Sequence, residues 1–196
     1  MKRTWIFAAI GVTALGGIVA ACKTSRAGYE SAPYTTVRKD GRFEIREYPA
    51  LTLVETPMPG RSEKSSNGSF GRLFRFISGG NDRKEKIAMT TPVFMAGEAE
   101  GATMAFVLPA NTKPDGVPKP SDENLKIREV PAGKFAVLRF DGSRSEKKEA
   151  AAAETLKVWI TKQGLQSEGG PVFGYFDPPW TPAFLLRNEV MFRLNP

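Results

Sequence analysis

The sequence predicts an α+β fold in which a duplicated strand–helix–strand–strand unit forms an antiparallel, distorted β-barrel or curved sheet with two main helices. The first observation is an internal repeat: residues 43–50 return as residues 125–132, 82 positions later, and five of the eight positions are identical. The second is that strand-like and helix-like segments follow both copies in the same order. The third is a content of 41% hydrophobic and 25% charged residues, which is typical of a globular protein.

Turn signals and alternation indicate the strands of the first half. Asp40 and Gly41 form a dipeptide that favours a tight hairpin turn between two strand-like runs. Residues 51–55 alternate between apolar and polar positions, as a half-buried strand does. The strands expected in this half cover residues 34–38, 43–48, 51–55, 91–95 and 104–108.

One helix is expected between these strands. Phe70, Leu73, Phe74 and Ile77 recur at helical spacing, and the glycine pair of residues 79–80 favours a helix end. The polar, serine-rich residues 60–68 before this stripe predict a loop.

The second half repeats this pattern. Ala152, Leu156, Trp159 and Ile160 line one face of a longer expected helix that stops near Gly164. Strands are expected over residues 125–130, 134–140, 172–176 and 184–194. The proline-rich residues 109–122 predict a semi-rigid crossover between the halves.

The composition excludes several kinds of chemistry. The chain of 196 residues has no histidine and one cysteine. Ser-His-Asp and Cys-His catalysis, a histidine-ligated metal site and an internal disulfide are therefore excluded. No paired-carboxylate signature stands out, so we expect a protein that is not an enzyme and has no metal site of its own. The net charge of +7 is spread without a long basic run, which argues against nucleic-acid binding.

The N-terminus has the layout of a secretory signal. Lys2 and Arg3 precede an uncharged segment that closes on small residues and Cys22, the only thiol of the chain. This ending resembles the bacterial lipobox, which implies a signal peptide over residues 1–21, lipidation of Cys22 and attachment to a membrane. Lys23 in the next position resembles the signal for delivery to the outer membrane, facing the periplasm. A transmembrane anchor is the alternative, although three glycines make the segment a poor permanent helix.

The remaining chain divides into a short tether and one domain. We expect the lipidated cysteine and a polar tether over residues 22–32, and a ligand-binding domain over residues 33–196. Its pseudo-repeat halves cover about residues 33–109 and 120–196. A cleft between such halves is a common ligand site.

Several segments in order resemble the SOUL haem-binding protein family. The most specific is residues 86–93, with the sequence Lys-Ile-Ala-Met-Thr-Thr-Pro-Val. The others are residues 43–49, 73–81, 104–109, 118–120, 175–182 and 187–190. The resemblance covers nearly the whole expected domain. It implies a duplicated α+β barrel and binding of haem or another tetrapyrrole in a shallow hydrophobic cleft.

The resemblance also implies which residues form that cleft. Carried over by position, Phe70 and Phe74 lie against the porphyrin, Arg75 pairs with a propionate, and Trp180 belongs to the opposite wall. The family often has methionine where this chain has phenylalanine, so a soft thioether is missing. Thr181 stands where some members carry a cation. The alternative for Phe70 and Phe74 is an ordinary core stripe, and for Trp180 a plug of the barrel mouth.

Two further groups of residues each allow a structural and a functional interpretation. Glu189 lies two positions from Arg187 on an expected strand, so either the two form an ion pair or Glu189 attracts a cationic ligand in the cleft. Met89 and Met95 are expected to fill core space rather than to ligate iron.

The sequence therefore predicts a lipid-anchored envelope protein that binds haem or another tetrapyrrole without a histidine ligand. The alternatives are a binding module for other lipophilic small molecules, including cationic ones, and an envelope interaction protein without a small ligand.

Overall fold

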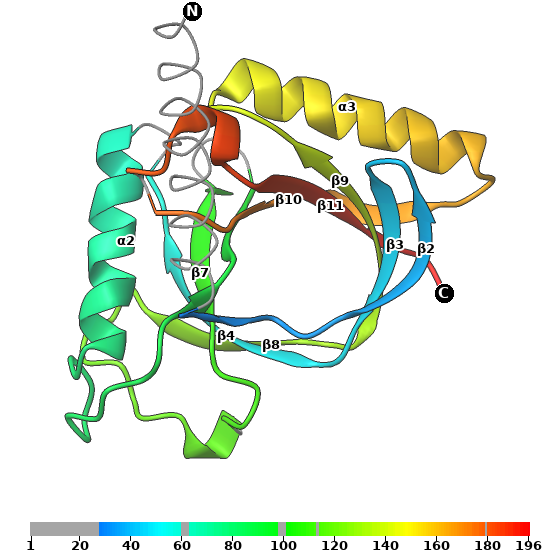
Figure 1. The fold of residues 1–196 in the computed structure, drawn as a ribbon. Coiled ribbons are helices and arrows are strands. Elements are labelled where there is room, and N and C mark those ends of the chain that lie inside the picture. The colour runs from blue at the N-terminus through cyan, green and yellow to red at the C-terminus, as the bar shows by residue number, and fades with distance from the viewer. Residues whose placement is uncertain (1–27, 60–62, 98–100, 113, 179) are drawn as a thin grey trace, which may run out of the picture.

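A strongly curved antiparallel sheet is the centre of the fold. The structure is a computed structural model that describes residues 28–59, 63–97, 101–112, 114–178 and 180–196. Within these residues nine strands form one sheet in the order β2-β3-β9-β11-β10-β6-β7-β4-β8, which bends round a central space without closing into a barrel (Figure 1). The strands are β2 (Thr35–Asp40), β3 (Phe43–Tyr48), β4 (Leu51–Pro57), β6 (Val93–Ala96), β7 (Thr103–Val107), β8 (Lys126–Val130), β9 (Gly133–Phe140), β10 (Ser167–Tyr175) and β11 (Asn188–Leu194).

The remaining elements are helices and one short strand pair. The main helices are α2 (Glu63–Ile77) and α3 (Glu146–Lys162). A separate parallel pair joins β1 (Glu30–Ser31) to β5 (Thr90–Thr91), and short 3-10 helices occur at η2 (Pro114–Gly116) and η3 (Ala183–Leu185). No helix in the described part of the chain is long and apolar enough to cross a membrane.

The internal repeat has a direct counterpart in the sheet. The elements β3, β4, α2, β6 and β7 are followed in the second half by β8, β9, α3, β10 and β11. If each element is exchanged with its counterpart, the strand order from β3 to β8 stays the same when read from the other end. The predicted duplication is therefore confirmed. In each half the strand–helix–strand–strand unit is preceded by one more strand, β3 or β8, and both were among the strands expected from the sequence.

The two copies of the repeat meet at their Pro-Ala dipeptides. Tyr48 at the end of β3 pairs with Gly133 of β9, and Leu51 at the start of β4 pairs with Val130 of β8. Both ladders keep one register, so the dipeptide that links β3 to β4 lies opposite the one that links β8 to β9. Proline removes a ladder donor, and both prolines lie where the pairing is interrupted.

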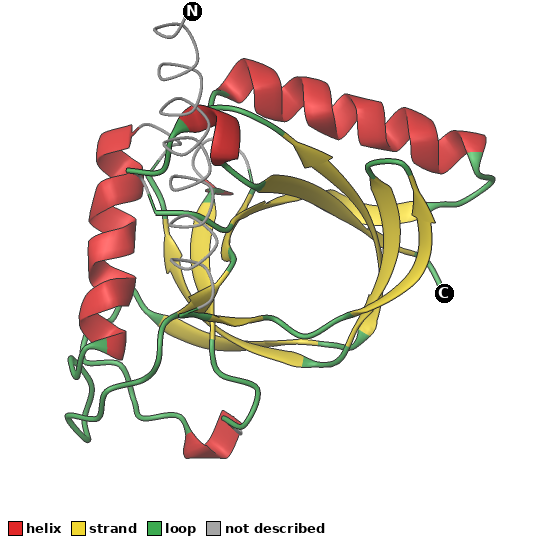
Figure 2. Ribbon diagram, in the orientation of Figure 1, coloured by secondary structure: helices red, strands yellow, loops and turns green. Residues whose placement is uncertain are grey.

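The two main helices cover the convex face of the sheet, as Figure 2 shows. The inward stripe of α3 is confirmed, since its apolar residues are buried against β9, β10 and β11. Leu73, Phe76 and Ile77 of α2 pack with outward residues of β4 and β7, including Val54 and Phe106. Each half thus buries its own core between one helix and the sheet.

Helix α2 is longer than the sequence indicated. The loop expected over residues 60–68 is wrong for Glu63 onwards, where the chain is already helical. Contacts with β4 follow directly after this part: Ser69 Oγ donates to the Pro57 carbonyl at 3.2 Å, and Arg72 donates to Thr56 Oγ1 at 3.0 Å and to the same carbonyl at 2.8 Å. These tertiary contacts outweigh the poor helix propensity of the serine and glycine residues. The helix ends as predicted, with Gly79 at a φ of +105°.

The last expected strand is too long. Residues 184–187 belong to η3 and the segment after it, and the strand starts only at Asn188. The backbone N–H of Leu185 donates to the Pro182 carbonyl at 2.8 Å, which forms a tight turn instead of extended chain. Proline at the start of this turn fixes a backbone angle that suits it.

A buried ion-pair network lies on the concave face. The Arg46 guanidinium of β3 donates to both carboxylate oxygens of Glu189 on β11, at 2.6 and 3.0 Å. Arg187 donates to the same carboxylate at 2.7 and 2.9 Å, and Glu44 accepts from Arg46 Nε at 2.7 Å. Glu189 is fully buried, so its charge depends on these partners.

We predict that Glu189→Ala lowers the free energy of unfolding by about 3–5 kcal/mol, because it leaves Arg46 buried without its main partner. Urea denaturation measures this loss. The matched control is Glu168→Ala, which breaks an exposed pair with Arg193 and should cost less than about 1 kcal/mol. Equal losses in the two variants would contradict the structural importance of the buried network.

Candidate functional site

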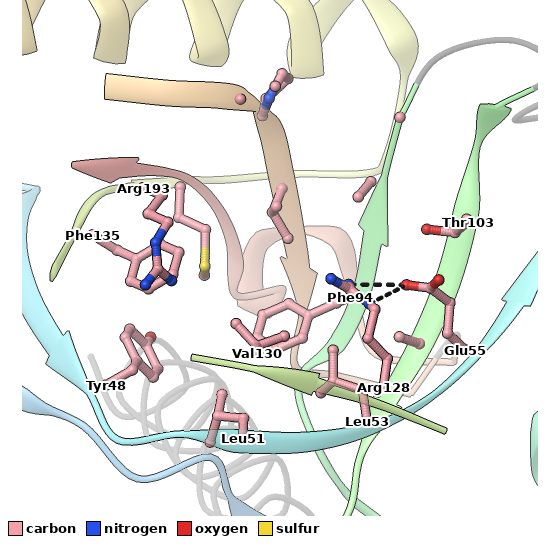
Figure 3. A pocket seen from close by; sticks show the side chains of 18 of the residues that line it. Tyr48, Leu51, Leu53, Glu55, Phe94, Thr103, Arg128, Val130, Phe135 and Arg193 are labelled. Atoms are coloured by element: carbon pink, nitrogen blue, oxygen red, sulfur yellow. Dashed lines mark hydrogen bonds and ion pairs between the residues drawn. The ribbon is translucent and has the colours of Figure 1, made fainter. Parts of the chain in front are cut away.

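A cavity of about 510 Å³ lies on the concave side of the sheet. Figure 3 shows side chains from several strands around it. Its walls are mainly apolar, and the innermost residues are less than a tenth exposed. Ala105 and other small residues on inward positions leave the space open. The apolar wall includes Leu51, Leu53, Phe94, Val130, Phe135 and Met191.

Charged residues form the exposed end of the cavity, which we call the mouth. Glu55 accepts from Arg128 at 2.9 and 3.1 Å at this end. A second pair, in which Glu168 accepts from Arg193 at 3.1 Å, lies at the rim nearer Tyr48, because the Arg193 guanidinium lies over Phe135 and that ring also contacts Tyr48 (Figure 3). Arg193 also donates to two main-chain carbonyls of the β8–β9 corner, which holds it in place. The register of β10 against β11 shifts after Glu168, so residues 169–171 bulge at the rim of the cavity next to this second pair.

Tyr48 closes the inner end. Its hydroxyl accepts a hydrogen bond from Arg46 at 3.3 Å, and this contact joins the cavity to the ion-pair network. Burial raises the pKa of Tyr48 to about 12, although the nearby Arg46 charge opposes this. Burial alone would lower the pKa of Arg46, but the hydrogen bonds and charge of Glu189 raise it above its ordinary value. Tyr48 is thus neutral and Arg46 charged at physiological pH.

A second surface lies on the outer face of α2. Phe70 and Phe74 are 38% and 49% exposed and lie nearly parallel, with ring centroids 6.1 Å apart. Phe70 also meets the edge of Phe106 in the core at 5.2 Å. Gly68 and Gly71 leave the neighbouring helix surface bare, since an added Cβ would meet nothing within 4 Å. The face offers aromatic rings beside accessible backbone, which suits a flat apolar ligand.

Arg75 extends this face with a positive charge. It is exposed, and in the described part of the chain no hydrogen bond or ion pair engages its guanidinium. Its neighbour Arg72, in contrast, is fixed by bonds to β4. Arg75 contributes with Arg72 to lowering the pKa of Asp122, after the hydrogen bonds from Asn124 that are the main cause. Arg75 can therefore bind an anionic group next to Phe74.

Trp180 stands on the loop between β10 and η3. It is 79% exposed, and Phe184 in the same segment is 66% exposed. Thr181 is buried and donates its backbone N–H to the Pro178 carbonyl. Two large aromatic side chains are thus presented to solvent by one proline-rich loop.

The other candidate residues from the sequence, Glu189, Met89 and Met95, form ion pairs or pack against the core of the fold. The ion pair between Arg187 and Glu189 is present, and the carboxylate is already bound by two guanidinium groups. Met95 is buried in the core under α2, and Met89 packs against that core. Among the described residues, no group of histidine, cysteine, aspartate or glutamate side chains is placed to hold a metal ion. Cys22, the signal segment and most of the tether lie outside the described residues.

Sequence reasoning singled out the helix face and missed the concave cavity. The alternating pattern of β4 could have indicated the lining of this cavity, because Leu51, Leu53 and Glu55 point to the same face of the strand. Small residues at inward positions, such as Ala105, were a second signal. Neither pattern alone distinguishes a hollow from a packed core, because that depends on which strands lie opposite.

We predict that Tyr48 makes the protein less stable in strong alkali. The pKa of its phenol is about 12 in the folded protein, compared with an ordinary value of 10.0. The folded state therefore favours the neutral phenol over the phenolate. This contribution is complete below pH 10 and is lost as the pH rises from 10 to 12, by up to about 2–3 kcal/mol. Urea denaturation across this range measures it. Tyr48→Phe should show a smaller alkaline loss than the wild type, and an identical loss would contradict the assignment.

Related proteins match most of the chain. Over 175 residues it is 27% identical to "Heme-binding protein 1" of Xenopus tropicalis, covering 80% of this chain and 86% of that protein. Over 141 residues it is 27% identical to "Heme-binding protein 2" of Mus musculus, covering 68% of each chain.

Solved structures share the fold at lower sequence identity. The EcmrR C-terminal domain has a TM-score of 0.59 at 13% identity, covering 83% of this chain and 98% of that one. A hydrolase from Listeria innocua has a TM-score of 0.54 at 9% identity, covering 81% and 94%. These likenesses concern the fold alone. The sequence profile of the SOUL heme-binding protein family, however, matches residues 29–193, and with the duplicated curved sheet this shows that the chain belongs to that family.

Proposed function

We propose that this protein binds haem or another tetrapyrrole on the outer face of α2 and is not an enzyme. The observation that carries this proposal is the stacked, half-exposed pair of Phe70 and Phe74 beside Arg75. Family membership and the names of the relatives support the choice of a tetrapyrrole.

The residues of this face fit the chemistry of the ligand. Phe70 and Phe74 supply apolar area, and burying one such side chain contributes about 1.5–3 kcal/mol. Gly68 and Gly71 let a flat ring approach the helix backbone, because no side chain stands there. Arg75 supplies a charge-assisted partner for a carboxylate such as a propionate. Trp180 adds a second exposed aromatic group, and we propose it as the opposite wall.

The sequence has no histidine, and this limits how the protein could bind haem. A strong histidine–iron bond does not contribute to affinity, so apolar contact and cations must supply most of it. When bound, haem would bring redox and ligand-binding chemistry of its own iron, while this chain positions the ring and pairs its carboxylates. We therefore propose a role in holding, carrying or scavenging the ligand.

We further propose that the protein is attached to a membrane of the bacterial envelope through Cys22, at the outer membrane and facing the periplasm. The support is the sequence alone: a basic start, an uncharged segment and a small-small-cysteine ending. Acyl chains on Cys22 would leave the ligand-binding domain outside the bilayer on a short tether.

We predict that haemin binds saturably, and that Phe74→Ser weakens the binding about tenfold or more, because the ring loses apolar contact. The shift of the Soret band during titration of the purified protein measures this. Metal-free porphyrin should bind within about tenfold of haemin, a difference of about 1.4 kcal/mol.

The control is Val158→Ser, which changes another half-exposed apolar residue on the other main helix. It should leave the haemin affinity unchanged. The proposal is contradicted if wild type shows no saturable Soret shift, or if both variants lose affinity equally. A strong preference for the iron form would contradict binding by apolar contact and charge.

We predict that the protein made in a bacterial host incorporates a palmitate analogue, and that Cys22→Ser abolishes the label because the acceptor thiol is lost. In-gel detection of the label measures this. Unlabelled wild type, or label that persists in Cys22→Ser, would contradict lipidation at this residue.

A further inference from the structure

We propose that the concave cavity is a second ligand site, and that it binds a long-chain carboxylate with its hydrocarbon tail inward and its carboxylate at the mouth. The cavity and its charges carry this inference independently of tetrapyrrole binding.

The cavity lies on the opposite side of the sheet from the aromatic face of α2. Adjacent residues of a strand point to opposite faces. On β7, Phe106 points outward and contacts Phe70, whereas its neighbour Ala105 lines the cavity. A ligand on α2 and a ligand in the cavity are therefore separated by the sheet itself, and both can be bound at once.

The inner part of the cavity matches a hydrocarbon chain. From Leu51 to Glu55 the wall follows four residue steps of β4, which corresponds to roughly 13 Å, and Tyr48 lies beyond Leu51. The walls between these two ends are apolar, as shown by Leu53, Phe94 and Met191. A volume of about 510 Å³ is in the range of ordinary small-molecule sites. A slender apolar tail can therefore leave water without burying an unpaired polar group.

The mouth offers donors for an anionic head group. Arg128 is half exposed and binds Glu55 through Nε and Nη2, and no bond in the described residues engages its Nη1. The bulge at Gly169 and Gly170 also lines the cavity, and it has backbone N–H groups outside the paired register of β10 and β11. Gly169 has a φ of +71°, and successive N–H groups in such conformations favour anions. Figure 3 shows Arg128 and Glu55 together at one side of the cavity.

The acidic groups near the cavity do not favour a cationic ligand. Glu55 at the mouth and Glu168 at the rim nearer Tyr48 are each paired with one arginine, and the Glu189 carboxylate is bound by two arginines. The chain as a whole carries a net charge of +7, which favours the approach of anions. An anionic head with an apolar tail therefore fits both parts of the site.

Titration with a dansyl-labelled fatty acid tests the proposal. We expect a saturable rise in fluorescence with wild type, and displacement of the probe by oleate. Oleyl alcohol has the same tail without the charge and should displace it about tenfold less effectively. Arg128→Gln should remove this preference, whereas Glu55→Gln frees the arginine and should keep or strengthen it. Arg38→Gln, an exposed arginine on β2, is the control and should behave as wild type.

A blocking variant separates the two sites. An added side chain at Gly170 has open space around its Cβ, so Gly170→Phe should fold and place an aromatic ring at the cavity. We expect it to lose the probe and keep haemin binding, while Phe74→Ser keeps the probe. Thermal melting by circular dichroism checks the fold of each variant. The inference is overturned if wild type does not bind the probe saturably, if haemin displaces the probe, or if oleyl alcohol competes as well as oleate. Loss of haemin binding alone would overturn only the proposed function.

Discussion

The pairing of β3–β4 with β8–β9 is the constraint on which the rest of this structure depends. Each copy of the repeat supplies one strand before and one strand after its Pro-Ala dipeptide, and the dipeptides face each other. Since the register is common to both ladders, it fixes which residues of four strands point to the concave side. Slipping by one residue would move Tyr48, Leu51 and Leu53 from the cavity to the helix-covered face.

Because the sheet is curved, its convex and concave faces have different surroundings. The convex face is buried by α2 and α3, so its residues make two compact cores. Among the described residues no helix covers the concave face, where the inward side chains of the strands lie opposite one another. At one end Arg46 and Glu189 fill this space with a buried ion pair, and at the other end small and aliphatic residues leave it hollow. The polar end fixes the strands, while the apolar end can accept a ligand.

This division suggests how a family fold can hold two kinds of ligand. The face of α2 lies outside the sheet, where Phe70 and Phe74 offer a flat aromatic platform and Arg75 a charge. The cavity lies on the concave side of the sheet. The chain has no histidine to ligate iron. At both proposed sites, therefore, shape complementarity, apolar contact area and arginine charge must supply the binding affinity. Attachment to a membrane would bring both sites close to lipophilic compounds.

The sequence by itself determined the duplication, most strands, the stripe of α3 and the end of α2, because turn residues and periodicity act locally. It also singled out Phe70, Phe74 and Arg75 through a resemblance. Only the tertiary structure showed that α2 begins before its apolar stripe, where Ser69 and Arg72 bind the Pro57 carbonyl of β4. The tertiary structure also showed that Glu189 pairs with Arg46, 143 residues away, and that a cavity lies on the concave face. Whether inward side chains fill a space depends on strand pairing and curvature, which no local pattern specifies.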